Sequence, residues 1–125
     1  MKLTRIYAGN DGESHFEDID LQLDTTQRRA TSDALPASFV AFGLSETMLP
    51  PQDWHPAPRR QLVTLIQGRL EIEVADGSRR QFGIGESFIA DDLTGHGHLT
   101  RDLEGPVNLL YVHLPDNLDF ERWQS

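Results

Sequence analysis

The side chains best suited to chemistry stand in two short segments of the sequence, 53–68 and 83–98. Imidazoles from both segments could bind a metal or transfer a proton, since histidine is the commonest metal ligand and changes charge near neutral pH. A guanidinium beside them could bind a carboxylate or phosphate through its planar pair of N–H groups. The sequence therefore predicts one pocket for a metal ion or a small anionic or oxygenated compound. The candidates are His55, Arg59 and Gln61 in the first segment and Asp92, His96 and His98 in the second.

Three of these histidines could share one ion. His96 and His98 are two residues apart, so on a strand they face the same side. With His55, and with or without Gln61, they would form a three-nitrogen site that suits Zn, Ni, Cu or Fe(II). The chain has no cysteine, so thiolate ligands are excluded. Gly97 leaves an alternative open, because a glycine bulge would turn one of the two histidines away.

A possible ligand clamp follows the first histidine. Arg59 and Gln61 are two residues apart on a predicted strand, so Arg59 points into the pocket if Gln61 does, and Arg60 then points away. There Arg59 and Gln61 would contact a bound compound, as would Asp92. The alternative is that the arginine forms an ion pair with Asp91, with Asp92 or with an acidic residue of a partner subunit.

The two remaining histidines are left out of the site. His113 lies inside an apolar run near the end of the chain and is expected to be structural. His15 stands alone near the N-terminus and is expected to be exposed.

The elements that must position these residues are strands. Apolar residues alternate or cluster in short runs between Gly, Pro, Asp and Asn, with hardly any helical spacing. The clearest signal is Asp76-Gly77 between alternating runs, which predicts a tight hairpin because both turn residues tolerate positive φ. The end of the chain, 116–124, could form a short helical turn. Strands are predicted at 3–7, 19–23, 38–42, 70–74, 79–82, 86–90 and 109–114, with a loop at 24–32.

This pattern predicts an all-β protein. The 125 residues are expected to form a single domain, 1–125, with one core. About eight to ten short, closely spaced strands favour a closed barrel or a two-sheet jelly roll.

The two segments resemble the paired motifs of the cupin superfamily, which are small jelly-roll barrels. The first motif ends in a glycine and contains two histidines and a glutamate. Counting back from Gly68 places Gln61 at the glutamate position, Ala57 at the second histidine position and His55 at the first.

The second cupin motif begins at a glycine and ends at a histidine. Counting forward from Gly85 places Asp91 at its proline position, Leu93 at its glycine position and His96 at its histidine position. The predicted hairpin at 71–82 falls between the two motifs, as the resemblance implies.

The resemblance implies a barrel pocket, and in metal-binding cupins the motif residues hold a divalent ion there. Ala57 and Gln61 replace two of the four ligands, so this site is depleted relative to the family. His98 is the residue that could repair it.

Three functions stay open. The first is a metal-dependent enzyme, such as an oxygenase, isomerase or lyase, with His55 and His96 as ligands and Arg59 orienting the substrate. The second is a binding or sensing protein without catalysis. The third is a metal-free isomerase resembling the sugar-nucleotide epimerases of this fold, in which Asp92 near His96 is the candidate dyad.

The net charge of the chain limits the classes of binding partner that we expect. Eleven basic and twenty acidic residues give a net charge of −9, which disfavours nucleic acid and anionic membranes. The N-terminus has no apolar signal segment, so a cytoplasmic location is expected. The resemblance also implies a homodimer, formed through sheet edges or exchanged N-terminal strands, for which 3–7 is the candidate strand.

Overall fold

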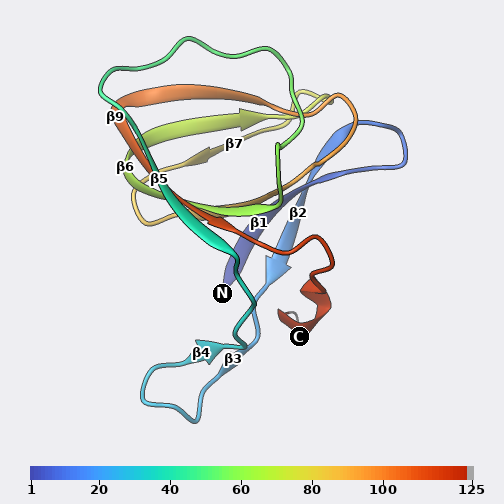
Figure 1. The fold of residues 1–125 in the computed structure, drawn as a ribbon, viewed down its shortest axis with the longest axis vertical. Coiled ribbons are helices and arrows are strands. Elements are labelled where there is room, and N and C mark those ends of the chain that lie inside the picture. The colour runs from blue at the N-terminus through green and yellow to red at the C-terminus, as the bar shows by residue number, and fades with distance from the viewer. Residues whose placement is uncertain (124–125) are drawn as a thin grey trace.

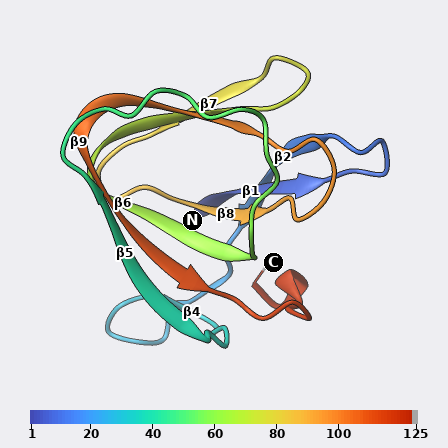
Figure 2. The same cartoon turned by 45° about the horizontal axis from the view of Figure 1, so that its top comes forward.

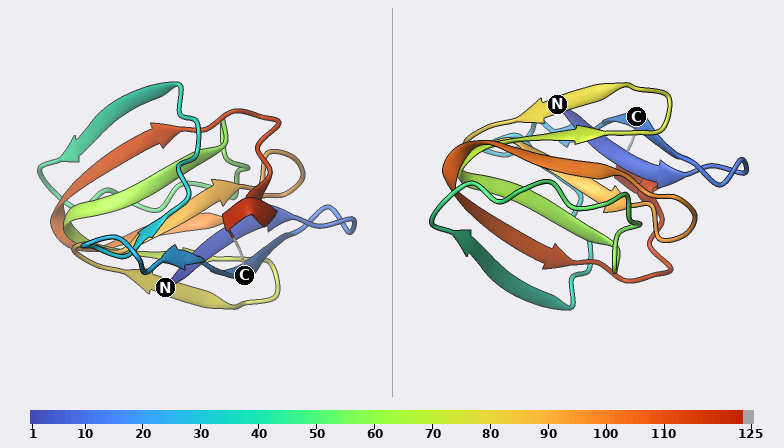
Figure 3. Two further views of the ribbon diagram at one scale, coloured as in Figure 1. Left: turned by 90° about the horizontal axis from the view of Figure 1, so that it is seen from below. Right: turned by 90° about the horizontal axis from the view of Figure 1, so that it is seen from above.

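The computed structural model describes residues 1–123, and its frame is a pair of long strands (Figure 1). β6 (Gln61–Glu73) and β9 (Leu99–His113) pair antiparallel along most of their length, with register shifts in the middle. Gly68 allows the close approach there: its φ is 86°, and a Cβ on it would lie 2.5 Å from the carbonyl oxygen of Pro106. The paired strands bend at this point, so the two halves of the pair come to lie in facing layers, as the curve of β9 shows in Figure 3.

Seven shorter strands complete the structure: β1 (Lys2–Ala8), β2 (Ser14–Asp20), β3 (Leu23–Asp24), β4 (Thr31–Ser32), β5 (Phe39–Ser45), β7 (Arg79–Phe82) and β8 (Ser87–Asp91). The main sheet has the order β2-β1-β8-β6-β9-β5, and β7 pairs with the second half of β6. β1 and β8 run parallel, whereas the other neighbours run antiparallel. Figure 2 shows β1, β8, β6, β9 and β5 side by side across the barrel wall.

The fold class predicted from the sequence is confirmed. The structure is an all-β jelly-roll barrel, and the expected C-terminal helical turn is the short 3₁₀ helix η1 (Phe120–Trp123). The two-residue strands β3 and β4 stand at the two ends of the loop predicted at 24–32, and they form a small ribbon at one end of the molecule (Figure 1). No helix in residues 1–123 is long and apolar enough to cross a membrane.

The hairpin predicted around Asp76-Gly77 joins β6 to β7. Gly77 has a φ of 89°, which is the left-handed conformation that the turn requires. The Asp76 carboxylate accepts a hydrogen bond from the amide of Ser78 at 2.8 Å. Hydrogen bonds from Ser78 lower the pKa of Asp76, so this turn is held by a carboxylate that stays ionised.

Three strands begin well upstream of their predicted extents. β2 begins at Ser14 rather than 19, β6 at Gln61 rather than 70, and β9 at Leu99 rather than 109. The first half of β9 is polar and pairs through charge: Arg101 lies 2.6 Å from the carboxylate of Glu73 on β6. Ion pairs across the strands replace the apolar alternation on which the prediction depended.

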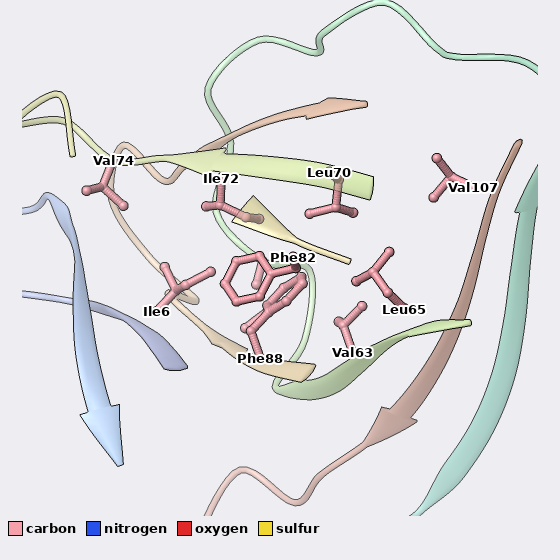
Figure 4. Packing of buried hydrophobic residues seen from close by; sticks show 11 residues of the cluster. Ile6, Val63, Leu65, Leu70, Ile72, Val74, Phe82, Phe88 and Val107 are labelled. Carbon is pink, nitrogen blue, oxygen red and sulfur yellow. The ribbon is translucent and has the colours of Figure 1, made fainter. Parts of the chain in front are cut away.

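The buried residues form two clusters. The larger cluster fills one end of the barrel, where alternate residues of β6 such as Leu70 and Ile72 point inward (Figure 4). Phe82 and Phe88 meet at its centre, with ring centroids 4.7 Å apart. Each such side chain contributes about 1.5–3 kcal/mol when fully buried. The smaller cluster packs the outer wall against the C-terminal turn and consists of Leu3, Ile19, Ile89, Leu114, Phe120 and Trp123.

Candidate functional site

The barrel contains a pocket of about 670 Å³. Its wall comes from β5, β6, β8 and β9 and from the segment 46–60. Figure 3 shows this segment passing across the barrel between β5 and β6. Much of the lining is apolar, as in small-molecule sites, where a few polar groups fix the orientation of the ligand. The polar side chains that line it are Ser45, Gln52, His55, Arg59, Gln61, His98, Thr100, Asp102, Tyr111 and His113.

His55 and His98 meet at the wall of this pocket. Their backbones form an isolated bridge, in which each amide donates to the carbonyl of the other at 3.1 and 3.0 Å. The ring centroids lie 5.2 Å apart. Gly97 makes the bridge possible, because its φ is 86° and a Cβ on it would lie 2.0 Å from the carbonyl carbon of His55. The glycine that follows His96 is therefore required by the close approach of two chain segments.

Buried hydrogen bonds hold the ring of His98. Its Nδ1 lies 2.6 Å from Oδ2 of Asp92, and the hydroxyl of Ser14 donates to the same oxygen at 2.7 Å. Asp92 is fully buried and the His98 side chain is 8% exposed, so water does not compete for this contact. A carboxylate next to Nδ1 selects the tautomer with the proton on Nδ1. His98 therefore has its lone pair on Nε2.

The ring of His55 has the same tautomer for a different reason. Its Nδ1 lies 2.9 Å from the carbonyl oxygen of Asp53, which can only accept, so Nδ1 bears the proton. The Nε2 atoms of His55 and His98 make no hydrogen bond to residues 1–123. Both rings thus line the pocket with a free lone pair, and each can accept a proton or bind an electrophile.

Asp92 occupies a different place from the one predicted. The sequence placed it among the groups that contact a bound compound, but it does not line the pocket, since it is buried behind His98. Its role toward the site is to orient His98 rather than to bind the ligand. Its other oxygen, Oδ1, is the one buried side-chain atom without a hydrogen-bond partner in the described part of the chain.

His96 lies outside the pocket, which corrects the expectation that it meets His55 there. Its ring stacks on Trp54 with centroids 4.9 Å apart, and its Nδ1 lies 3.1 Å from the carboxylate of Glu13. The expectation that His96 and His98 face one side required a strand. Residues 92–97 instead form a turn with positive φ at Gly95 and Gly97, so the alternation of a strand does not apply.

The two arginines that follow His55 separate as the strand alternation requires. Arg59 and Gln61 both line the pocket. Arg60 points away, and its Nε lies 2.5 Å from the carboxylate of Asp91, which also binds Arg5 at 2.7 Å. The ion pair considered for this region therefore belongs to Arg60. Arg59 has no ion pair with any residue in 1–123.

The sequence interpretation missed the polar face of β9. Asp102, Tyr111 and His113 line the pocket, and only His113 had been considered, as a structural residue. Burial, and then the charge of Asp102, raise the pKa of Tyr111 above 10.0. Gly43 of β5 leaves room for this ring, since a Cβ there would lie 2.8 Å from Cε2 of Tyr111. Alternation along 107–113 could have identified this face once the strand was known to line the pocket.

The donor set falls short of the predicted metal centre. Two imidazoles, His55 and His98, are together, and Gln61 offers a neutral amide oxygen. No group of three His, Asp or Glu side chains suited to a metal occurs in residues 1–123. Catalytic zinc sites have three protein ligands of these kinds. The residues present therefore do not fit a tight divalent metal site.

Comparisons with solved structures give several matches, among them the two that follow. Protein NMB1881 from Neisseria meningitidis is 20% identical, with a TM-score of 0.47, over 59% of this chain and 73% of its own. A Salmonella typhimurium protein described as ethanolamine utilization protein Q is 12% identical, with a TM-score of 0.46, over 94% of this chain and 98% of its own. No family model matches the sequence. No curated protein matches it.

Proposed function

We propose that this chain is a cupin-type protein whose barrel pocket binds a small anionic or oxygenated compound. The observation that supports this most directly is the arrangement of three side chains at one pocket. His55 and His98 present free Nε2 atoms there, and Arg59 adds a cation with no ion-pair partner in residues 1–123.

The pocket has the size and lining of a small-molecule site. Its volume of about 670 Å³ is in the usual range for such sites. Apolar residues such as Val63, Leu109 and Phe88 would cover the carbon skeleton of a ligand. The polar groups lie on β6, on β9 and on the segment 46–60, so they can contact a compound from several sides.

Arg59 gives the preference for an anion. A guanidinium binds a carboxylate or phosphate with paired hydrogen bonds, and such charge-assisted bonds contribute about 1.5–3 kcal/mol. Arg60 and Arg5 already share Asp91, whereas Arg59 is available to a ligand. The net charge of −9 means that most of the protein repels anions, so an anion would bind preferentially where Arg59 adds a local positive charge.

A second function, metal-free proton transfer on the bound compound, is favoured by the contact between His98 and Asp92. In this reading neutral His98 accepts a proton at Nε2 from a carbon next to a carbonyl or carboxylate group. The buried carboxylate of Asp92 stabilises the resulting imidazolium through Nδ1–H. Return of the proton to another face or carbon would make the reaction an isomerisation. The dyad thus uses His98, and not His96 as the sequence suggested.

Binding measurements test the first function. We expect calorimetric titration with a panel of dicarboxylates, sugar acids and inorganic phosphate to identify at least one compound that binds the tag-free protein. Arg59→Gln should weaken that compound by about tenfold to a hundredfold, which is the value of a charge-assisted hydrogen bond. Arg28→Gln, in an exposed loop, is the matched control and should bind normally. A panel that binds nothing, or equal affinity in both variants, would contradict the proposal.

A further inference from the structure

One end of the pocket is formed by the first half of β9 and contains an acidic side chain. Thr100 and Asp102 line the pocket there, two and four residues beyond His98. Strands rise about 3.3 Å per residue, so Asp102 lies up to about 13 Å along the chain from His98. Asp102 pairs with Leu70, near the bend of β6 at Gly68. The carboxylate therefore lies toward the bend, away from the two histidines.

Arg59 lies toward the opposite end of the pocket. It comes two residues before Gln61, at which β6 begins. This end belongs to the first half of β6, whereas Asp102 pairs with the second half, and the two halves lie in facing layers. In Figure 4, Val63 and Leu70 point toward each other from these two halves. Arg59 and Asp102 both line the pocket, and no ion pair joins them in the described part of the chain, so their charges are held apart.

The carboxylate of Asp102 is only partly used by the protein. The backbone amide of Leu49 donates to its Oδ2 at 3.0 Å, which fixes the side chain against the segment 46–60. Among the described residues, no group donates to Oδ1 and no cation pairs with the carboxylate. The neighbouring Arg101 instead lies 2.6 Å from the carboxylate of Glu73. A carboxylate that lines a pocket with one oxygen unused can accept a hydrogen bond from a ligand.

The charge of Asp102 acts across the pocket. Burial raises the pKa of Tyr111, and the charge of Asp102 raises it further. Tyr111 pairs with Val63 in the first half of β6, so its strand segment lies in the layer opposite Asp102. An anionic group of a ligand in this region would meet the same repulsion, whereas a hydroxyl or ammonium group would be attracted.

We propose that the ligand has a single acidic group and, at its other end, a hydrogen-bond donor, either a hydroxyl or an ammonium group. The acidic group binds Arg59, the carbon chain crosses the apolar lining, and the donor bonds Oδ1 of Asp102. This inference rests on the proposed function and narrows it. Hydroxy acids and amino acids with their two groups at opposite ends match the pocket, and dicarboxylates do not.

Titrations followed by NMR chemical shifts test this with acids that share one skeleton, namely hexanoate, ω-hydroxyhexanoate, ω-aminohexanoate and adipate. We expect the hydroxy acid or the amino acid to bind about tenfold or more tightly than hexanoate, which is the effect of one charge-assisted hydrogen bond. The tighter of the two identifies the donor. Adipate should bind more weakly than hexanoate, because its second carboxylate meets Asp102. Hexanoate or adipate that binds as tightly as both donor acids would overturn the inference.

Asp102→Asn and Glu104→Gln are a matched pair of variants on β9. Each removes one negative charge and keeps the shape of the side chain, but Glu104 is 71% exposed and does not line the pocket. The ratio of the affinities for ω-aminohexanoate and adipate should fall about tenfold or more in Asp102→Asn. It should stay unchanged in Glu104→Gln. Equal ratios in the two variants would overturn the inference.

Arg59→Gln separates this inference from the proposed function. It should weaken all of these acids alike, because each has a carboxylate for Arg59. If the acids bind and depend on Arg59 but do not differ by their end groups, the inference is wrong and the proposed function stands. If none of them binds, or if Arg59→Gln has no effect, both are wrong.

Discussion

Oδ2 of Asp92 lies 2.6 Å from Nδ1 of His98, and both side chains are buried. This contact decides which nitrogen of His98 is available to the pocket. The hydroxyl of Ser14, on β2, shares the same oxygen at 2.7 Å. The N-terminal hairpin therefore takes part in orienting a side chain that lines the pocket.

The tautomer of His98 can be observed directly. We expect long-range ¹H–¹⁵N correlation spectra of the neutral ring to show a proton on Nδ1 of His98 and none on Nε2. The spectrum of His98→Gln identifies which signals belong to His98. A neutral ring with its proton on Nε2 and none on Nδ1 would show that Asp92 does not orient the ring, and would remove the lone pair from the pocket.

The buried bonds to Asp92 should contribute unequally to stability. Asp92→Ala removes a charge-assisted bond and should lower the free energy of unfolding by about 1.5–3 kcal/mol or more. Ser14→Ala should lower it by about 1 kcal/mol. Urea unfolding of both single variants and of the double variant measures the coupling. Fully additive losses would contradict a shared network.

Alanine substitutions at Gly97 and Gly77 separate the cost of backbone strain from the cost of a steric clash. Both have positive φ, so alanine costs each about 1–2 kcal/mol. Only at Gly97 would the new Cβ collide with a backbone, that of His55, whereas nothing lies within 4 Å at Gly77. Gly97→Ala should therefore lose about 1–3 kcal/mol more in urea unfolding, the usual cost of overpacking. Similar losses at both positions would show that the bridge between His55 and His98 adds little.

Tyr111 should make stability depend on alkaline pH. Burial raises the pKa of Tyr111 in the folded protein. Its contribution to the free energy of unfolding is therefore complete below pH 10.0, and is lost as the pH rises from the pKa of the unfolded state through that of the folded state. Tyr7→Phe leaves Tyr111 as the one tyrosine of the chain. In this variant the phenolate absorbance should develop at higher pH in the folded protein than in urea. Coincident titrations would place Tyr111 in water rather than in the pocket wall.

A chelator should leave ligand binding unchanged. Two imidazoles and an amide do not make a tight divalent site, so Zn or Ni should be removed easily from tag-free protein. The affinity for the organic anion should be equal before and after dialysis against the chelator. Stoichiometric metal that resists dialysis, or binding that requires it, would contradict this account and favour a metal-dependent function.

The fold could be predicted from the sequence because its signals are local. The alternation at 70–74 and the turn at Asp76-Gly77 specify a hairpin within a few residues. The start of β9 was harder to predict from the sequence, because the first half of this strand is stabilised by ion pairs such as that of Arg101 with Glu73. A strand of that kind has no apolar period to reveal it.

The site was predicted in part, and its errors have one cause. The motif spacing led to His55 and to the alternation of Arg59 with Gln61, which line the pocket. It proposed both His96 and His98 beside His55, whereas only His98 lines the pocket. The conformation of Gly97, which separates the two histidines, depends on the backbone of His55, far away in sequence. Close approaches between distant segments are a tertiary property, and a spacing rule does not include them.

The most direct test of the central claim is a crystal structure with the organic anion that binds most tightly in the calorimetric panel. The account predicts the anion inside the barrel, with its carboxylate or phosphate on the guanidinium of Arg59 and a hydroxyl group or an acidic C–H group next to Nε2 of His98. An anion bound outside the barrel, or a metal ion between the ligand and the two histidines, would contradict it.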